Sequence, residues 1–320
     1  MTIPLQKYVT QFLDERHRLG FQSRSMGHAL RGLAAFVENL ALAGPLTREV
    51  MAQWARQPSN DSVDPKTWAR RLKILRPFTR WLRQFEPDTD VPDEAIFGSV
   101  GERMTPHIDS KQEIVDLLAA ARQLQPSRRG ATYETLFGLL AATGLRLSEA
   151  VHLCQGDVDL KRGVLTVRQT KFAKSRQVPV HPTTLAALRR YREQCDRDLT
   201  ATEESPFFVG SRDRRHAHRP SPRQVDRIFQ QLREQLGWVN RGAHATPRLH
   251  DLRHTFVVRR ILLWQAQGVD IDQRMLALST YVGHAHVTDT YWYLRAVPEL
   301  MAVAAECFEA GQPAAEVACD

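Results

Sequence analysis

The sequence has no long apolar run and few cysteines. Its longest hydrophobic stretches, such as residues 261–264, are far shorter than the roughly 18 residues that a membrane-spanning helix needs. The first residues also lack the charged-then-apolar order of a secretory signal, so the sequence predicts a cytoplasmic protein with no membrane partner. The four cysteines form no CxxC pair, and neither a disulfide framework nor structural zinc is expected. They are Cys154, Cys195, Cys307 and Cys319.

Signatures of nucleotide and metal chemistry are missing as well. The chain contains no GxxxxGK[ST] loop, which would cradle the phosphates of a nucleotide. It contains no HExxH motif and no compact carboxylate cluster of the kind that holds magnesium. The sequence thus gives no sign of a nucleotide-binding or metal-binding site.

The composition is that of a folded protein with an excess of basic residues. Hydrophobic residues make up 42% and charged residues 25% of the 320 positions, which is ordinary for a globular protein of two domains. Lysine and arginine total 44 against 36 acidic residues, a formal charge of +8. Such a surplus indicates an anionic partner, because neutralising nucleic-acid phosphates releases condensed counterions. The alternative is simple solubility, and the placement of the arginines has to decide between the two.

Residues 1–86 have the periodicity of a small helical domain. Apolar residues recur at steps of three and four, which predicts amphipathic helices. Thr47 is a candidate N-cap, and Pro77 predicts a kink or a break in the last of the four helices. The apolar positions of two helices are Leu30, Leu33, Phe36, Val37 and Leu40, and Trp68, Leu72, Leu75, Phe78 and Leu82.

The same helices carry many basic residues on their polar positions. They are Arg16, Arg18, Arg24, Arg31, Arg70, Arg71, Lys73, Arg76 and Arg80. This distribution suits contact with a DNA backbone, but a solvated helix face would look the same. From these residues alone the two interpretations stand about equal.

A second domain is predicted after a linker at residues 87–104, which is rich in proline, glycine and aspartate. Ser110 and Glu113 have the spacing of a capping box at the start of the new domain, residues 105–297. A further helix is expected from about Tyr133 to Gly144, since glycine is the residue that best tolerates a helix end.

The apolar period then changes from that of a helix to that of a strand. Residues 163–168 and 177–180 are short and rich in β-branched side chains, and the polar residues between them predict a hairpin. Helices are expected again at residues 183–195, at 222–236 behind a Ser221 cap, and at 250–267. The predicted fold class is mainly α with a small β-sheet (α+β).

Two groups of residues have the spacing of an anion site. Arg146 follows Gly144 and precedes Glu149 by three positions, so the glutamate can orient the arginine toward an anion. His250 and Arg253 are also three positions apart at a helix start, where both can reach one phosphate. A surface salt bridge and a structural histidine are the alternatives.

Two further groups carry proton-transfer and nucleophilic side chains. Lys171 and Lys174 lie in the predicted hairpin turn, where a lysine can protonate a leaving oxygen. His284 precedes Tyr293 by nine residues. A tyrosine hydroxyl, with a pKa of about 10, needs cationic surroundings to attack phosphorus. An exposed basic turn and an aromatic packing stripe are the alternatives for these two groups.

In their order along the chain these motifs resemble the tyrosine recombinase family, also called the phage or λ integrase family. The resemblance rests on TGLRLSE at 143–149, a lysine-bearing hairpin ending in RQVPV at 176–180, HDLRHTF at 250–256, VGH at 282–284, and Tyr293. It covers about the last two-thirds of the chain by motif, and the N-terminal helices match that family's core-binding domain in arrangement only. Each motif alone is weak, but five in this order are highly specific.

The resemblance implies a role for each matching residue. The proposed catalytic set is Arg146, Lys171, His250, Arg253, His284 and Tyr293, with Glu149 supporting and Lys174 as the alternative lysine. The arginines would bind the phosphate, Tyr293 would be the nucleophile, and His250 is a candidate base. Val282 stands where the family usually has leucine. Tyr291, two residues before Tyr293, is a competing tyrosine that on a helix would point about 200° away.

The implied activity is site-specific DNA recombination or integration, in which strands are cut and rejoined through a 3′-phosphotyrosine without metal or ATP. A mobile element is the expected source. A type IB topoisomerase-like enzyme and a catalytically inactive DNA-binding regulator are the alternatives. The implied partners are double-stranded DNA, a homotetramer on two DNA sites, and other recombinases of the same element. Residues 298–320 form a C-terminal tail that is exchanged between protomers or packs on its own domain.

Overall fold

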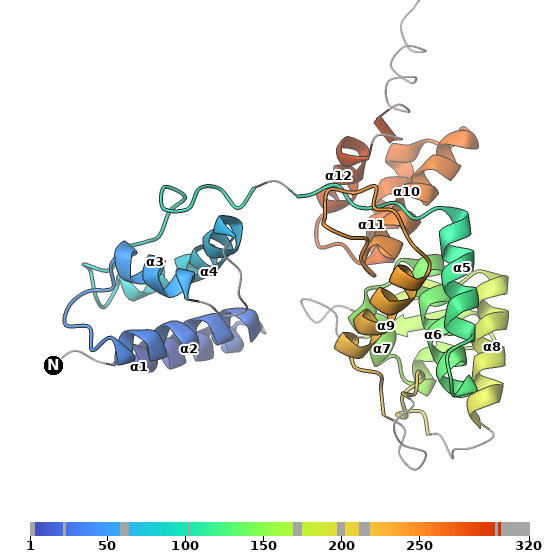
Figure 1. Cartoon of the computed structure of the whole chain (residues 1–320), viewed down its shortest axis with the longest axis horizontal. Coiled ribbons are helices and arrows are strands. Elements are labelled where there is room, and N and C mark those ends of the chain that lie inside the picture. Colours follow the sequence, from blue (N-terminus) through green and yellow to red (C-terminus); the bar gives the residue numbers. More distant parts are fainter. Residues whose placement is uncertain are drawn as a thin grey trace, which may run out of the picture. The chain divides into compact units, whose positions relative to one another are not determined.

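The computed structural model describes residues 4–21, 24–57, 64–101, 103–168, 175–196, 202–210, 218–297 and 300–301. The chain divides into two compact units, Met1–Arg103 and Met104–Asp320. The described residues are mainly helical with one small sheet, as the sequence predicts (Figure 1). No helix among them is long and apolar enough to cross a membrane.

The described residues of the first unit form four helices around one apolar core. The helices are α1 (Leu5–Arg18), α2 (Arg24–Asn39), α3 (Arg48–Arg56) and α4 (Pro65–Leu82). The Thr47 hydroxyl accepts from the amide of Val50 at the start of α3, which confirms the predicted cap. Helix α4 runs on through Pro77 without a break, although proline cannot donate the usual i→i−4 bond. The prediction for Leu40 was wrong: α2 ends one residue earlier, and this side chain is 45% exposed.

The basic residues predicted on the polar positions of these helices fall into two groups. Arg16, Arg71 and Arg76 have internal roles. Arg16 stacks on Phe21, Arg71 donates to the carbonyls of residues 55 and 57, and Arg76 donates to the carbonyl of residue 92. The others whose side chains are described are exposed: Arg18, Arg31, Arg70, Lys73 and Arg80. This second group is available to an anionic partner.

The second unit surrounds its core with eight α-helices among the described residues. They are α5 (Lys111–Arg122), α6 (Ser127–Thr143), α7 (Leu147–His152), α8 (Pro182–Asp196), α9 (Pro222–Gln235), α10 (Asp251–Ala266), α11 (Ile271–Val282) and α12 (Thr288–Ala296). The capping box of Ser110 and Glu113 and the Ser221 cap are both present as predicted. Figure 1 shows α6 inside this unit, packed against α5, α8 and α10.

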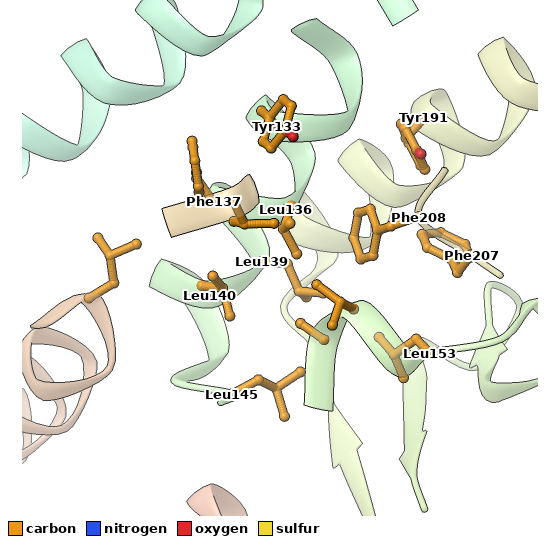
Figure 2. Close-up of a cluster of buried hydrophobic side chains, with 14 of the residues drawn as sticks. Tyr133, Leu136, Phe137, Leu139, Leu140, Leu145, Leu153, Tyr191, Phe207 and Phe208 are labelled. Atoms are coloured by element: carbon orange, nitrogen blue, oxygen red, sulfur yellow. The ribbon is translucent and has the colours of Figure 1, made fainter. Parts of the chain in front are cut away.

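Helix α6 supplies much of the buried surface that supports the rest of the unit. Figure 2 shows Leu136 and Leu139 of this helix in one buried cluster with Phe207 and Phe208 and with Tyr191 of α8. The helix begins at Ser127, six residues before the predicted start at Tyr133. Its first turn is polar and contains two arginines and a glycine, so the apolar period becomes visible only at Tyr133.

The sheet has three antiparallel strands in the order β1 (Val158–Asp159), β2 (Val164–Val167) and β3 (Arg176–Pro179). Strands β2 and β3 form the predicted hairpin, and Val167 pairs with Arg176 at the end nearest the turn. Strand β1 was not predicted, because two residues are too few to show an alternating pattern. A 3-10 turn, η1 (Gln155–Asp157), leads into the sheet.

Candidate active site

The turn between α6 and α7 positions Arg146. Gly144 ends α6 with a left-handed φ of 63°, and a Cβ there would lie 2.6 Å from the Phe256 ring, so only glycine fits. Leu145 is 2% exposed and anchors the turn in the core drawn in Figure 2. Arg146 then becomes the N-cap residue of α7 with its side chain one-third exposed. The turn therefore holds a partly solvated guanidinium at a fixed place.

A buried glutamate holds two arginines together. Glu149 accepts from Arg146 Nη1 at 2.9 Å and from Arg176 Nη2 at 2.8 Å, and its other contacts include the Arg146 amide at 3.0 Å. Burial by itself would raise the pKa of Glu149, but the hydrogen bonds and charge of Arg176, followed by those of Arg146, lower it. The carboxylate therefore stays ionised and fixes both guanidinium groups.

The same two arginines reach the end of α11. Arg176 Nε donates to the carbonyl of Tyr281 at 2.9 Å, and Arg146 Nη2 donates to the carbonyl of Gly283 at 2.8 Å. Gly283 has a φ of 73°, and a Cβ there would lie 2.5 Å from Arg176 Nη1. The loop that carries His284 is thus tied to the base of the hairpin and to the turn at Arg146.

The first turn of α10 supplies Arg253, which is 2% exposed. Its Nη1 donates to the carbonyl of Gly144 at 2.6 Å, which places it beside Arg146. Its Nη2 is buried and has no hydrogen-bond partner among the described residues. Burial, then the nearby charge of Arg146, lowers the pKa of Arg253 to about 10. Arg253 therefore remains cationic at neutral pH with one donor ready for an anion.

His250 is the N-cap residue of α10 and precedes Arg253 by three positions. Desolvation, followed by the charges of Arg253 and Arg248, lowers the pKa of His250 to about 4. The residue as a whole is exposed to solvent. His250 is thus neutral at pH 7 in the unliganded protein and can donate one hydrogen bond.

His284 and Tyr293 lie together at the C-terminal side of the unit. His284 Nδ1 is 2.7 Å from the Thr290 hydroxyl, and its ring is stacked at 17° on the ring of Tyr293 with centroids 6.4 Å apart. Tyr293 is fully buried on α12, and its hydroxyl lies 2.6 Å from His254 Nδ1. Tyr291 points elsewhere, since its hydroxyl donates to Asp272 at 3.0 Å.

The structure therefore brings six of the predicted residues into one connected site. Arg253 contacts the turn that carries Arg146, and Arg146 contacts both Glu149 and the loop that carries His284. His284 stacks on Tyr293, and the Tyr293 hydroxyl contacts α10, which His250 caps. The set is Arg146, Glu149, His250, Arg253, His284 and Tyr293. Lys171 and Lys174 lie outside the described residues. No group of three or more histidine, cysteine, aspartate or glutamate side chains in the described ranges is placed to hold a metal ion.

Arg176 and His254 belong to this site although no role was predicted for them. Both stood inside motifs that the sequence analysis used, RQVPV and HDLRHTF. Their partners, Glu149 and Tyr293, lie 27 and 39 residues away in the sequence. The positive charge of Arg176 was the available clue in the sequence, since a glutamate in an anion site needs cationic neighbours. No local spacing linked Arg176 to Glu149.

Replacing Arg176 by leucine is expected to lower the free energy of unfolding by about 3 kcal/mol. The change leaves the buried carboxylate of Glu149 with one charged partner fewer, which is costly in a region of low dielectric. Urea unfolding measures the loss. Arg122→Leu is the matched control, because its pair with Glu134 involves an arginine side chain that is 70% exposed and should contribute less than about 1 kcal/mol. Equal losses in the two variants would contradict the prediction.

Comparison with known proteins decides the family. The model of the phage integrase family matches residues 110–299, which is more than half of the chain and includes every residue of the connected site. The chain belongs to the phage integrase family. It is accordingly an enzyme of the tyrosine recombinase class, as the motifs indicated.

Relatives in this family extend over most of the chain. A Sinorhizobium fredii protein named as integrase/recombinase y4rB is 38% identical over 300 residues, which are 92% of this chain and 93% of that protein. The tyrosine recombinase XerC of Chromobacterium violaceum is 29% identical over 234 residues, which are 72% of this chain and 70% of that protein.

Solved structures of phage integrase relatives share the fold. The Tn1549 transposon integrase in complex with a circular intermediate DNA matches with a TM-score of 0.66 at 15% identity, covering 96% of this chain and all of that one. A lambda integrase dimer bound to a COC' core site matches with a TM-score of 0.60 at 16% identity, covering 91% of this chain and 77% of that one.

Proposed function

We propose that this chain is a site-specific DNA recombinase or integrase of a mobile element, acting in the cytoplasm on double-stranded DNA. The observation that carries the proposal is that two arginines, two histidines and one tyrosine lie together in a single connected site. Arg253 contributes most to it, because its buried Nη2 has no partner in the described part of the chain and the arginine interacts electrostatically with Tyr293. A DNA phosphate would supply the missing acceptor.

The reaction begins with attack by the Tyr293 oxygen on a DNA phosphorus. A 3′-phosphotyrosine forms, the bond from phosphorus to the 5′ oxygen breaks, and the 5′-hydroxyl then attacks the matching intermediate on a partner duplex. Arg146 and Arg253 neutralise the charge that grows on the pentacoordinate phosphorus. His250 and His284 donate hydrogen bonds to the non-bridging oxygens. Because the covalent link conserves the bond energy, neither ATP nor metal is required.

Lys171 is the proposed general acid, with Lys174 as the competitor. Strand β3 begins at Arg176, whose contacts with Glu149 fix one base of the hairpin that carries both lysines. Lys171→Ala is expected to slow cleavage by roughly 10²–10⁴-fold, because the 5′ oxygen then leaves without a proton. A 5′-bridging phosphorothiolate should restore the rate, since a thiolate departs unprotonated. Rescue confined to Lys174→Ala would reverse the assignment, and rescue in neither variant would contradict a lysine acid.

DNA binding is assigned to both units. The exposed basic residues of the first unit suit a phosphate backbone, while the connected site of the second unit takes the reacting phosphate. The relatives with the same fold were solved on DNA, one of them as a transposon integrase and one as a dimer. Assembly as a tetramer on two sites, with other recombinases of the same element as further partners, extends this proposal. In the tail, Leu300 packs into its own unit, and residues 302–320 lie outside the described chain.

The test is covalent capture on DNA of unspecified sequence. The full chain is incubated with a pooled library of nicked duplexes carrying randomised inverted repeats, and protein–DNA adducts are recovered on a denaturing gel. Adducts that enrich a defined sequence support the proposal, and the enriched duplex becomes the substrate for the later experiments. DNA binding without any adduct would contradict it and favour an inactive regulator. Relaxation of a supercoiled plasmid with one selected site, without exchange between two sites, would favour a topoisomerase.

A further inference from the structure

The hydroxyl of Tyr293 has a histidine partner that lies outside the set the family resemblance implies. His254 Nδ1 is 2.6 Å from this oxygen, and the two rings are tilted at 55° with centroids 5.5 Å apart. Both residues are buried, Tyr293 fully and His254 to all but 4%. A hydrogen bond this short between two desolvated groups is strong, because no water competes for either atom.

The other two histidines of the site face different atoms. His284 directs Nδ1 at the Thr290 hydroxyl and presents the face of its ring to Tyr293. His250 meets the ring of His254 edge to face, at 86° with centroids 4.8 Å apart. His254 follows Arg253 directly on α10, so one helical turn presents a guanidinium and an imidazole to the same tyrosine.

We propose that His254 is the general base that takes the proton of Tyr293 when the tyrosine attacks DNA. This inference rests on the proposed recombinase function. The Tyr293 O–H bond breaks and its proton moves to His254 Nδ1, while the oxygen forms its bond to phosphorus. The bond to the 5′ oxygen breaks at the other side, and that oxygen receives its proton from the hairpin lysine. Rejoining reverses each transfer, so His254 returns the proton to the departing tyrosine.

The chemistry of the surroundings favours this direction. Nδ1 accepts the proton when the neutral imidazole carries its own hydrogen on Nε2. The pKa of a free tyrosine is about 10 and that of a free histidine about 6.5, so the transfer is uphill unless the phenolate is stabilised. Arg253 supplies that stabilisation, since its charge interacts with a Tyr293 anion in the same buried place. The proton then leaves at the moment when phosphorus accepts the oxygen.

Replacing His254 by asparagine separates proton transfer from simple positioning. The asparagine amide occupies the place of Nδ1 and keeps a hydrogen bond to the hydroxyl, but it cannot accept a proton at neutral pH. We expect covalent capture on the selected duplex to slow by roughly 10²–10⁴-fold, the usual contribution of a general base, with DNA affinity unchanged. If the asparagine variant does not fold, as judged by circular dichroism, His254→Gln carries the same test.

A tyrosine analogue with a more acidic hydroxyl at position 293 tests whether the loss in His254→Asn comes from the missing base. Trifluorotyrosine at position 293, whose phenol loses its proton far more readily, needs no base. It should reduce the effect of His254→Asn to less than about tenfold. His250→Asn is the matched control on the same helix, because a residue that binds the phosphate should show the same loss with either tyrosine.

Three results would overturn the inference. Full activity of the asparagine variant, or a loss that trifluorotyrosine leaves unchanged, would show that His254 is not the base while leaving the recombinase function intact. Absence of any adduct from the unmodified protein would instead remove the proposed function itself, and the base with it.

Discussion

Replacing Tyr293 by phenylalanine is expected to abolish covalent attachment to DNA while leaving DNA binding nearly unchanged. The substitution removes one oxygen, and the fully buried ring keeps its place beside His284 and within the apolar cluster of α10, α11 and α12. Adduct formation on nicked duplexes, measured on denaturing gels, should fall below detection. Gel-shift titration with the same duplex should give an affinity close to that of the unmodified protein.

Tyr291→Phe is the matched control for this prediction. Both tyrosines lie on α12, but the Tyr291 hydroxyl donates to Asp272 and Tyr291 is partly exposed. Its loss should leave adduct formation within about twofold, because breaking one exposed hydrogen bond costs little. An adduct that survives Tyr293→Phe and disappears in Tyr291→Phe would show that the wrong tyrosine was assigned.

The second large effect concerns the arginine pair. Arg146→Ala and Arg253→Ala should each slow cleavage by roughly 100- to 1,000-fold, since removing one preorganised charge donor costs about 2.7–4 kcal/mol of transition-state stabilisation. Single-turnover rates on the selected duplex measure the effect. DNA affinity should fall much less, because these guanidinium groups gain most of their interaction energy as charge develops on phosphorus.

Folding has to be separated from catalysis in these variants. Arg253 is nearly fully buried, and the amide and guanidinium of Arg146 donate three hydrogen bonds within the site. Each variant is therefore first compared with the unmodified protein by thermal unfolding. Arg122→Ala, a change on the surface of α5, should alter neither rate nor affinity. Equal losses of binding and cleavage in the folded variants would mean that the arginines position DNA without stabilising the transition state.

Local rules placed the ends of many elements correctly from sequence. Gly144 ends α6 as predicted, and Ser110 with Glu113 begins α5, because a cap depends on residues no more than a few positions apart. The same rules missed the first turn of α6 and the short strand β1, where the sequence has too few apolar residues to show a period. The mainly helical fold with one small sheet followed from periods that extend over longer segments.

Family motifs predicted which residues form the site but not the contacts between them. They named the residues that the structure brings together around Arg146 and Arg253, but motif order says nothing of which atom faces which. Two hydrogen bonds join elements that are far apart in the chain. One links Arg176 to Glu149, and the other links His254 to the Tyr293 hydroxyl. Such pairs are set by packing of α7 against the hairpin and of α10 against α12, which no local pattern encodes.

The most direct test of the account is to locate the DNA adduct on the protein. The covalent complex formed with the selected duplex is digested with nuclease and protease, and the modified peptide is sequenced by mass spectrometry. The account predicts one nucleotide linked through its 3′ phosphate to Tyr293. An adduct on Tyr291, on a serine or on any other side chain would contradict it.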